Sequence, residues 1–318
     1  MNDNQHAGLG SAERASGAEP KRVLCLGAAI LDTIFRVAAI PTTPIKVLPT
    51  DCVQIGSGMA SSAAASIARL GGKSRIWGRV GDDLAGQQYL DDLAAAGVDV
   101  AQVRRVPGRR TPISTIIVDR HGERLIVPYY DPLLDTDPSW LPVDELPWFD
   151  AVMCDVRWPD GSARLLQAAR DAGTIAVLDG DIGPPGVVER LLPLATHAIL
   201  SEPALASLTG TENLGAALAA AARLTPALVG VTAGERGFYW LEDGQVRHVP
   251  APQVQAIDTL AAGDVFHGAF ALGLAEGMTV AEAGRFACVA ASIKCTRFGG
   301  RLGAPTRDEV VATLGSSS

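Results

Sequence analysis

The chain has 318 residues, 47% of them hydrophobic, and a formal net charge of −8. This length and composition support a substantial core, in one large α/β domain or two smaller ones. With 27 basic against 35 acidic residues and no dense basic segment, the sequence argues against nucleic acid and against an anionic membrane surface as partners. An anionic ligand therefore has to be held by a few placed groups.

Both ends of the chain and its cysteines indicate a cytoplasmic protein. Residues 1–20 are polar and small and lack the apolar core of a secretion signal, so we expect a disordered tail there and an equally loose end at residues 315–318. No stretch approaches the roughly 18 consecutive apolar residues that span a bilayer. The five cysteines are scattered and form no CxxC pair, which favours reduced thiols over a metal site.

A buried strand opens the folded region. Residues 22–29 form an apolar run closed by small residues, as in a parallel strand that enters a loop, and Asp32 follows. By pattern alone Asp32 is a helix cap or a turn residue. Further on, Gly56, Ser57 and Gly58 precede an Ala-rich helix, and by pattern alone they also fit a plain turn.

Two β-prone segments interrupt the α/β pattern. Residues 35–55 hold three prolines between short β-prone pieces, and residues 111–118 pair with residues 123–130 across a turn signal. We expect these segments, from about 33–56 and 109–130, to project from the main sheet as a small second sheet.

Strand and helix patterns alternate elsewhere in the chain. The expected elements are strands at 74–80, 151–155, 174–179 and 198–200 and helices at 87–96, 163–172, 186–194 and 280–295. Alternation of this kind predicts βαβ units in a mostly parallel sheet, with ligands beyond the carboxyl ends of the strands. Arg157 follows one such end. It fits a surface salt bridge, but a guanidinium also suits recognition of a carboxylate, phosphate or sulfonate.

The clearest chemical signal is the segment 257–274. Three small residues, Ala261, Ala262 and Gly263, lead to Asp264 and into an apolar, Ala-rich helix. The first N–H groups of a helix have no intrahelical partners, so small side chains there leave room for a phosphate or oxyanion. A carboxylate beside such a cradle can accept the proton of an attacking hydroxyl, as phosphoryl transfer requires. The alternative is that Asp264 merely complements the helix dipole.

The run Asp258-Thr259-Leu260-Ala261-Ala262-Gly263-Asp264 resembles the Asp-Thr-x-Gly-Ala-Gly-Asp signature of the ribokinase-like (PfkB) carbohydrate kinases. Six of its seven positions are compatible, with Ala261 in place of the first Gly. The resemblance covers about residues 21–314. It implies an α/β fold with a three-layer, doubly wound, mostly parallel sheet, and a small β-sheet lid that closes over the sugar and makes a homodimer contact. It implies an ATP-dependent sugar kinase that uses Mg²⁺, and it leaves open a monovalent cation near residues 296–300.

The resemblance also assigns roles to individual residues. The expected site residues are Asp264, Gly263, Ala262 and Ala261 for catalysis; Asp32, Lys46, Gly56, Ser57, Gly58 and Arg157 for the sugar; and Thr232, Gly234, Gly237 and Thr259 for the nucleotide. The loop 232–237 would otherwise be a simple hairpin turn. Ser201 and Ala204 stand where the family has an Asn-x-x-Glu motif that organises magnesium, so Glu202 becomes the candidate metal ligand.

Several short strings look like those of bacterial 6-deoxy-6-sulfofructose kinases: residues 154–158, 178–182, 200–203, 264–268 and 294–301. In that group a Lys, an Asn and an Arg grip the sulfonate. Lys46 and Arg157 fit the Lys and Arg places, whereas the Asn place falls on Pro128, which has no donor. The expected reaction is phosphorylation of 6-deoxy-6-sulfofructose to its 1-phosphate. The alternatives are another ketose or acidic sugar (fructose, fructose 6-phosphate or 2-keto-3-deoxygluconate) and a non-catalytic sugar-responsive regulator.

Overall fold

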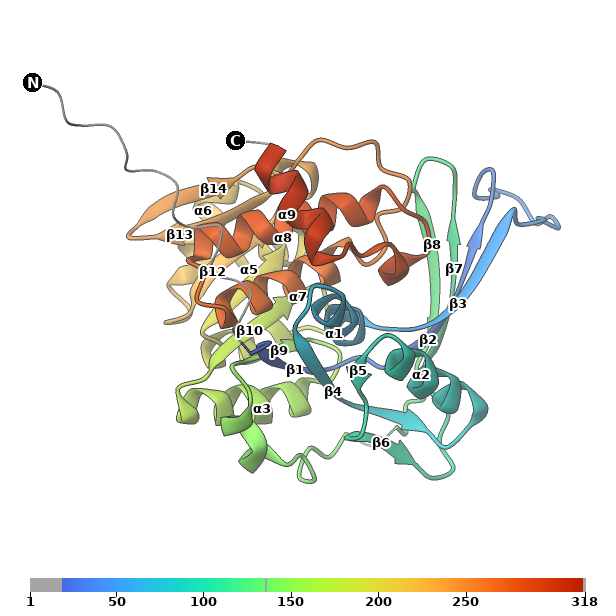
Figure 1. The fold of residues 1–318 in the computed structure, drawn as a ribbon, viewed down its shortest axis with the longest axis horizontal. Helices are drawn as coiled ribbons and strands as arrows, with labels where there is room; N and C mark the ends of the chain where they lie inside the picture. The colour runs from blue at the N-terminus through green and yellow to red at the C-terminus, as the bar shows by residue number, and fades with distance from the viewer. Residues whose placement is uncertain (1–18, 135, 317–318) are drawn as a thin grey trace, which may run out of the picture.

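Residues 19–134 and 136–316 are described in the computed structural model, and they form two sheets of unequal size (Figure 1). The strands of the large sheet are β1 (Arg22–Leu26), β4 (Lys73–Gly81), β5 (Val98–Asp99), β6 (Val103–Val106), β9 (Ala151–Asp155), β10 (Ile175–Gly180), β11 (His197–Ser201), β12 (Leu228–Thr232), β13 (Phe238–Glu242) and β14 (Gln245–Val249). Those of the small sheet are β2 (Ile30–Arg36), β3 (Asp51–Ser57), β7 (Ile113–Val118) and β8 (Arg124–Tyr129).

The large sheet is mostly parallel. Its strands follow the order β14-β13-β12-β11-β10-β9-β1-β4-β5, and β6 pairs with β4. The pairings of β13 with β12 and β14 are antiparallel, and the others are parallel. The doubly wound fold predicted from alternating strand and helix patterns is confirmed. The carboxyl ends of β9 to β12 consequently meet at one edge of the sheet, where ligands bind in such folds.

Helices cover both faces of the large sheet. One face carries α1 (Met59–Arg69), α2 (Leu84–Ala95), α7 (Ala262–Ala275), α8 (Val280–Cys295) and α9 (Arg307–Ser316). The other carries α3 (Pro159–Ala172), α4 (Val187–Leu191), α5 (Glu202–Thr209) and α6 (Leu214–Ala222). Short 3₁₀ turns are η1 (Val143–Trp148), η2 (Leu192–Leu194), η3 (Gly234–Arg236) and η4 (Gly300–Gly303). In β1, Val23 and Cys25 pack into the first core and Leu24 and Leu26 into the second, which explains its unbroken apolar run.

The small sheet stands apart from these layers (Figure 1). Its order is β3-β2-β7-β8, with β2 and β7 parallel and the two outer pairings antiparallel. Ile34, Ile55, Ile116 and Val118 form its own core. The two β-prone segments seen in the sequence supply these strands, but residues 37–50 form no strand.

The first strand is shorter than its apolar run. Strand β1 ends at Leu26. At the next residue, Gly27, the chain passes so close to Asp155 that an added Cβ would lie 2.1 Å from its carboxylate, so only glycine fits there. A second strand then begins at Ile30. Asp32 therefore lies within β2 of the small sheet and is neither a cap nor a turn residue.

The two ends of the chain are described in part. Of the expected tail, residues 1–18 lie outside the described residues, and Glu19 pairs with Arg22. Helix α9 includes the first two of the four C-terminal residues expected to be loose, and residues 317–318 lie outside the described part. In residues 19–134 and 136–316 no helix is long and apolar enough to cross a membrane.

Candidate active site

Two cavities meet at the N-terminus of α7. The first, of about 410 Å³, lies between the β12–β13 loop, α7 and α8 and is called here the α7–α8 cavity. The second, of about 450 Å³, lies between β2, β7, β8 and the strand ends of the large sheet and is called the small-sheet cavity. Thr232, Thr259, Ala262 and Gly263 line both. Both cavities thus open where the sequence predicts a ligand, beyond the carboxyl ends of parallel strands.

The segment before α7 forms the wall that the two cavities share. Ala261 adopts the left-handed conformation, with φ 63°, and α7 begins at the next residue. An added Cβ at Gly263 would meet nothing within 4 Å, so the first turn of the helix faces open space. The N–H of Ala262 donates to Thr259 O at 3.2 Å, so one of the three expected donors also closes a turn. An anion that enters here meets the positive end of the helix dipole.

Asp264 lies in the first turn of α7 and lines the small-sheet cavity. Burial and the nearby Asp179 carboxylate raise the pKa of Asp264 to about 8, against the opposite effects of His267 and of a hydrogen bond with Ser62. A carboxyl group with a pKa near neutrality can both take up and release a proton at working pH. The geometry therefore suits Asp264 for proton transfer.

His267, one turn further along α7, connects this helix to β10 and β11. Its Nδ1 lies 2.7 Å from Gly263 O and 3.3 Å from Asp179 Oδ2, and its Nε2 lies 3.2 Å from Ile199 O. Burial lowers the pKa of His267 and raises the pKa of Asp179. Through these contacts with β10 and β11, His267 fixes the orientation of the first turn of α7.

Three of the expected sugar residues line the small-sheet cavity, namely Asp32, Ser57 and Gly58. The hydroxyl of Ser114 on β7 donates to Asp32 Oδ1 at 2.5 Å, and burial raises the pKa of Asp32. Gly56 lies behind the cavity and does not line it. Its N–H donates at 2.6 Å to a carboxylate of α2, which anchors the loop that presents the other two residues.

Arg157 also lines the small-sheet cavity, just beyond β9. Its backbone N–H donates to Asp155 Oδ1 at 2.8 Å, and its Nη2 donates to Asp181 Oδ2 at 3.1 Å. Lys46 is exposed in the connection between β2 and β3 and lines neither cavity. Lys46 and Arg157 thus do not border one cavity in this structure, since residues 37–50 form no strand, and a joint grip on one anion stays a prediction.

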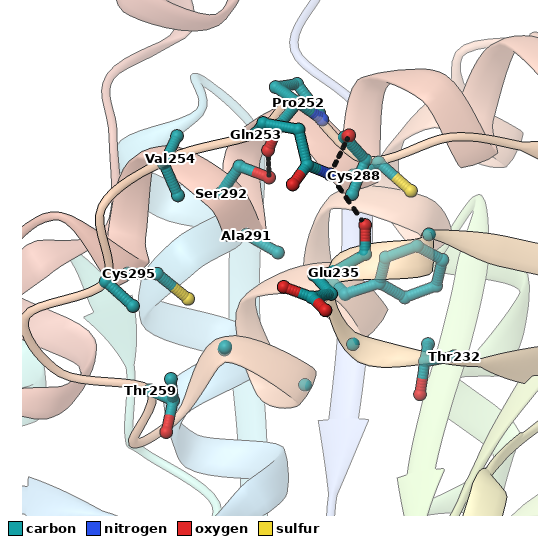
Figure 2. A pocket seen from close by; sticks show the side chains of 17 residues that line it. Thr232, Glu235, Pro252, Gln253, Val254, Thr259, Cys288, Ala291, Ser292 and Cys295 are labelled. Atoms are coloured by element: carbon teal, nitrogen blue, oxygen red, sulfur yellow. Dashed lines mark hydrogen bonds between the residues drawn. The ribbon is translucent and has the colours of Figure 1, made fainter. Parts of the chain in front are cut away.

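The α7–α8 cavity contains all four expected nucleotide residues, Thr232, Gly234, Gly237 and Thr259. Figure 2 shows the side chains that complete its walls, among them Pro252, Gln253, Val254, Cys288, Ala291, Ser292 and Cys295. An added Cβ at Gly237 would lie 2.2 Å from Val249 O, so the loop can turn this tightly only with glycine. Walls that are largely apolar, with a few polar groups at one end, suit a flat heterocycle joined to a polar chain.

A profile of the family described as pfkB family carbohydrate kinase matches residues 20–307. The chain belongs to the pfkB family of carbohydrate kinases. The enzyme class expected from the sequence, an ATP-dependent sugar kinase, is confirmed by this match.

Individual relatives of this pfkB-family kinase carry different names. A fructokinase from Klebsiella pneumoniae is 34% identical over 242 residues, which cover 70% of this chain and 78% of the fructokinase. A ribokinase from Bacillus subtilis (strain 168) is 26% identical over 296 residues, which cover 92% and 99%. A solved structure from Agrobacterium tumefaciens, described as a proposed ribokinase, has a TM-score of 0.92 at 48% identity and covers 94% of this chain and 99% of its own. The ribokinase-like fold is thereby confirmed.

The candidate metal ligand does not fit a metal site. The carboxylate of Glu202 pairs with the guanidinium of Arg236 and lines neither cavity. Within the described parts of this kinase, residues 19–134 and 136–316, no group of three or more His, Cys, Asp or Glu side chains could hold a metal ion. The ion pair with Arg236 speaks against Glu202 as a metal ligand, and that role stays a prediction.

Several polar residues of the kinase site were not assigned roles from the sequence. Arg124 on β8 lines the small-sheet cavity, and its Nη1 donates to Thr259 Oγ1 at 2.7 Å. Asp155 Oδ2 accepts from Ala28 N at 2.8 Å and from Ala60 N at 3.0 Å, so it joins the loops on either side of the cavity. An acid at the end of an apolar strand is a signal that could have singled out Asp155. Nothing local to Arg124 distinguishes it from other exposed arginines.

Proposed function

We propose that this kinase transfers the γ-phosphoryl group of ATP to a primary hydroxyl of an acidic ketose, with 6-deoxy-6-sulfofructose, converted to its 1-phosphate, as the first candidate. The observation that carries the proposal is that Arg157 and Asp264 line the same small-sheet cavity. A sugar with a hydroxyl at one end and an anionic group at the other can contact both. The planar guanidinium suits a sulfonate, carboxylate or phosphate.

The proposed reaction is direct in-line transfer. Asp32 and the loop at Ser57 and Gly58 orient the sugar, and Asp264 accepts the proton of its primary hydroxyl. Backbone N–H groups of residues 261–263 stabilise the charged phosphoryl group as it moves. No covalent intermediate is required, since the hydroxyl attacks the phosphorus directly.

In this scheme ATP binds in the α7–α8 cavity, on the opposite side of the first turn of α7 from the sugar. Its base and ribose occupy the α7–α8 cavity near Thr232 and Gly234, and its phosphates extend toward the first turn of α7. Mg²⁺ would come as part of the nucleotide substrate and, when bound to the phosphates, would neutralise part of their charge.

The small sheet is proposed to act as a lid. Its strands β2, β7 and β8 contribute Asp32, Ser114 and Arg124 to the small-sheet cavity, so movement of the sheet changes the sugar's surroundings directly. Closure excludes water and so suppresses hydrolysis of the nucleotide.

The lid is also proposed to form a homodimer contact. Strand β8 is exposed over its whole length, and Leu125, Val127 and Tyr129 share the face opposite to Ile126 and Pro128, which line the small-sheet cavity. Contiguous exposed apolar side chains of this kind mark interaction surfaces. Light scattering of the purified protein should give twice the chain mass, and Val127→Glu should reduce it to one chain. A monomeric wild type would contradict the contact.

Two observations favour a second candidate class, another ketose or acidic sugar. Pro128 lines the small-sheet cavity at the place where a sulfonate-binding Asn is expected, and it has no donor. Lys46 lies outside the cavity. The loss of one neutral donor costs on the order of 1–3 kcal/mol, which is enough to change preference among anionic sugars. Fructose, fructose 6-phosphate and 2-keto-3-deoxygluconate are therefore the other sugars to test.

The deciding experiment is ATP consumption against 6-deoxy-6-sulfofructose and these three sugars, with ribose added. Selective turnover of the sulfosugar supports the first candidate. An inert sulfosugar beside rapid turnover of another sugar overturns it. If no sugar is phosphorylated but one raises the melting temperature, the protein is a sugar-responsive regulator.

A further inference from the structure

One lysine of this kinase is completely buried. Lys294, in the last turn of α8, has 0% of its surface exposed. Its Nζ donates to Asp258 O at 2.5 Å and lies 3.4 Å from Asp258 Oδ2. A buried ammonium is tolerated only when it is paired and hydrogen-bonded, so the charge of Lys294 depends on both the carbonyl and the carboxylate of Asp258.

Asp258, the partner of this lysine, anchors the segment before α7 through several hydrogen bonds. Asp258 Oδ2 accepts from Gly299 N at 3.0 Å and Gly300 N at 2.9 Å, and its Oδ1 accepts from Leu260 N at 2.8 Å. The N–H of Asp258 donates to Cys295 O at 3.1 Å. One residue thus joins the segment before α7, the end of α8 and the glycines at the start of η4. Ala261, the left-handed residue of the cradle, comes three positions later.

We propose that Lys294 is a positioning residue whose ammonium holds residues 258–261 in place for phosphoryl transfer, so that the reaction needs no added monovalent cation. The inference rests on the proposed function. A carbonyl and a carboxylate oxygen directed at one buried position favour a positive charge there. Here a side chain of the same protein supplies that positive charge. Because Lys294 is part of the chain, its ammonium group cannot dissociate from the site or exchange with cations of the solvent.

The surroundings agree with a charged lysine that depends on its partner. Burial lowers the pKa of Lys294, while the Asp258 carboxylate acts in the opposite direction. Arg124, which donates to Thr259 next in sequence, also faces Lys294 and disfavours its charge. The Cys295 thiol, whose pKa burial raises, adds no charge while it stays protonated.

The test compares kcat in potassium chloride and in choline chloride at equal ionic strength. Wild type should show equal kcat in both salts. Lys294→Ala should lose of the order of a hundredfold in kcat in choline, as expected for a misplaced reacting group. Potassium or ammonium should restore part of that loss by entering the vacated space. Lys73→Ala, at a half-exposed lysine of β4, is the matched control and should behave as wild type.

Three results would overturn the proposal: a wild type that needs potassium, a Lys294→Ala with full activity in choline, or a loss that no cation restores. If Lys294→Ala does not fold, Lys294→Met takes its place. Because methionine fills the space without the charge, Lys294→Met should lose kcat in both salts with no rescue by a cation, and full activity of Lys294→Met would overturn the proposal. If the wild type phosphorylates no sugar, the proposed function fails. Binding of the cation is then measured through its effect on the melting temperature in place of kcat. Potassium should then stabilise Lys294→Ala and leave wild type unchanged, because a ligand that binds only the folded state raises its stability.

Discussion

Arg124 Nη1 donates to Thr259 Oγ1 at 2.7 Å, which joins the small sheet to the segment that begins α7. If this contact helps to close the cavity over the sugar, Arg124→Gln should lower kcat/KM by about tenfold, as loss of a hydrogen bond from a charged group does. Steady-state kinetics with the accepted sugar measures this. Arg120→Gln, in the exposed turn between β7 and β8, is the matched control. Unchanged kcat/KM in Arg124→Gln would show that the contact has no part in the reaction.

The assignment of Asp264 as the base has a direct test. Asp264→Asn should lower kcat by at least about a hundredfold, because the amide cannot accept the hydroxyl proton. Nucleotide affinity should stay near that of wild type, since the N–H groups of the cradle remain. The exposed Asp308→Asn on α9 serves as the control. An Asp264→Asn enzyme with normal turnover would remove this residue from the mechanism.

The raised pKa of Asp264 predicts a particular pH profile. A protonated carboxyl group cannot act as the base, so kcat/KM should rise with pH and level off above the pKa of about 8. The groups that face Asp264 are Asp179, Asp155, His267 and Ser62. Because Asp179 raises the pKa of Asp264, Asp179→Asn should move the midpoint to lower pH. A profile that is flat from about pH 6 to about pH 9 would contradict the assignment.

Arg157 should discriminate between sugars by charge. Arg157→Met should lower kcat/KM for an anionic sugar by about tenfold to a hundredfold, as loss of a charged hydrogen-bond partner does. Turnover of fructose, which carries no charge, should change little. Measuring both sugars with one enzyme preparation separates lost recognition from lost folding. Equal losses for both sugars would make Arg157 a structural partner of Asp181.

The left-handed Ala261 predicts a gain in stability. Its φ of 63° costs an alanine roughly 1–2 kcal/mol, which a glycine does not pay. Ala261→Gly should therefore raise the free energy of unfolding by up to about 1 kcal/mol in urea titrations. Ala262→Gly, one residue later and inside α7, should instead lower it by roughly 0.5–1 kcal/mol. A destabilised Ala261→Gly would mean that the alanine methyl group contributes packing that outweighs the backbone strain.

Local patterns predicted the regular elements well. Strand β9 (Ala151–Asp155) and helix α8 (Val280–Cys295) have the boundaries expected from the sequence. The reason is local: β9 is an apolar run with an acid at its end, and α8 begins at the Thr279 capping box. Of the two glycine loops, Ser57 and Gly58 line the small-sheet cavity and Thr232, Gly234 and Gly237 line the α7–α8 cavity, whereas Gly56 lines neither.

Contacts between residues far apart in the sequence could not be predicted from local patterns. By pattern alone Asp32 fitted a helix cap or a turn, yet it lies in β2, because this strand pairs in parallel with β7, 82 residues away at Ser114. Lys46 looked suitable for an anion, but residues 37–50 form no strand and Lys46 lines neither cavity. The contact of Arg124 with Thr259 spans 135 positions. Periodicity within a short window carries no information about such distances.

Thr232, Thr259, Ala262 and Gly263 border both cavities, so the two cavities adjoin at the first turn of α7. A single compound in which adenosine is linked through a phosphate chain to the sugar can therefore lie in both cavities at once. Once one half is bound, the other binds at an effective concentration set by the linker. Such a bisubstrate ligand would draw its affinity from both cavities, and its selectivity among related kinases from the sugar half.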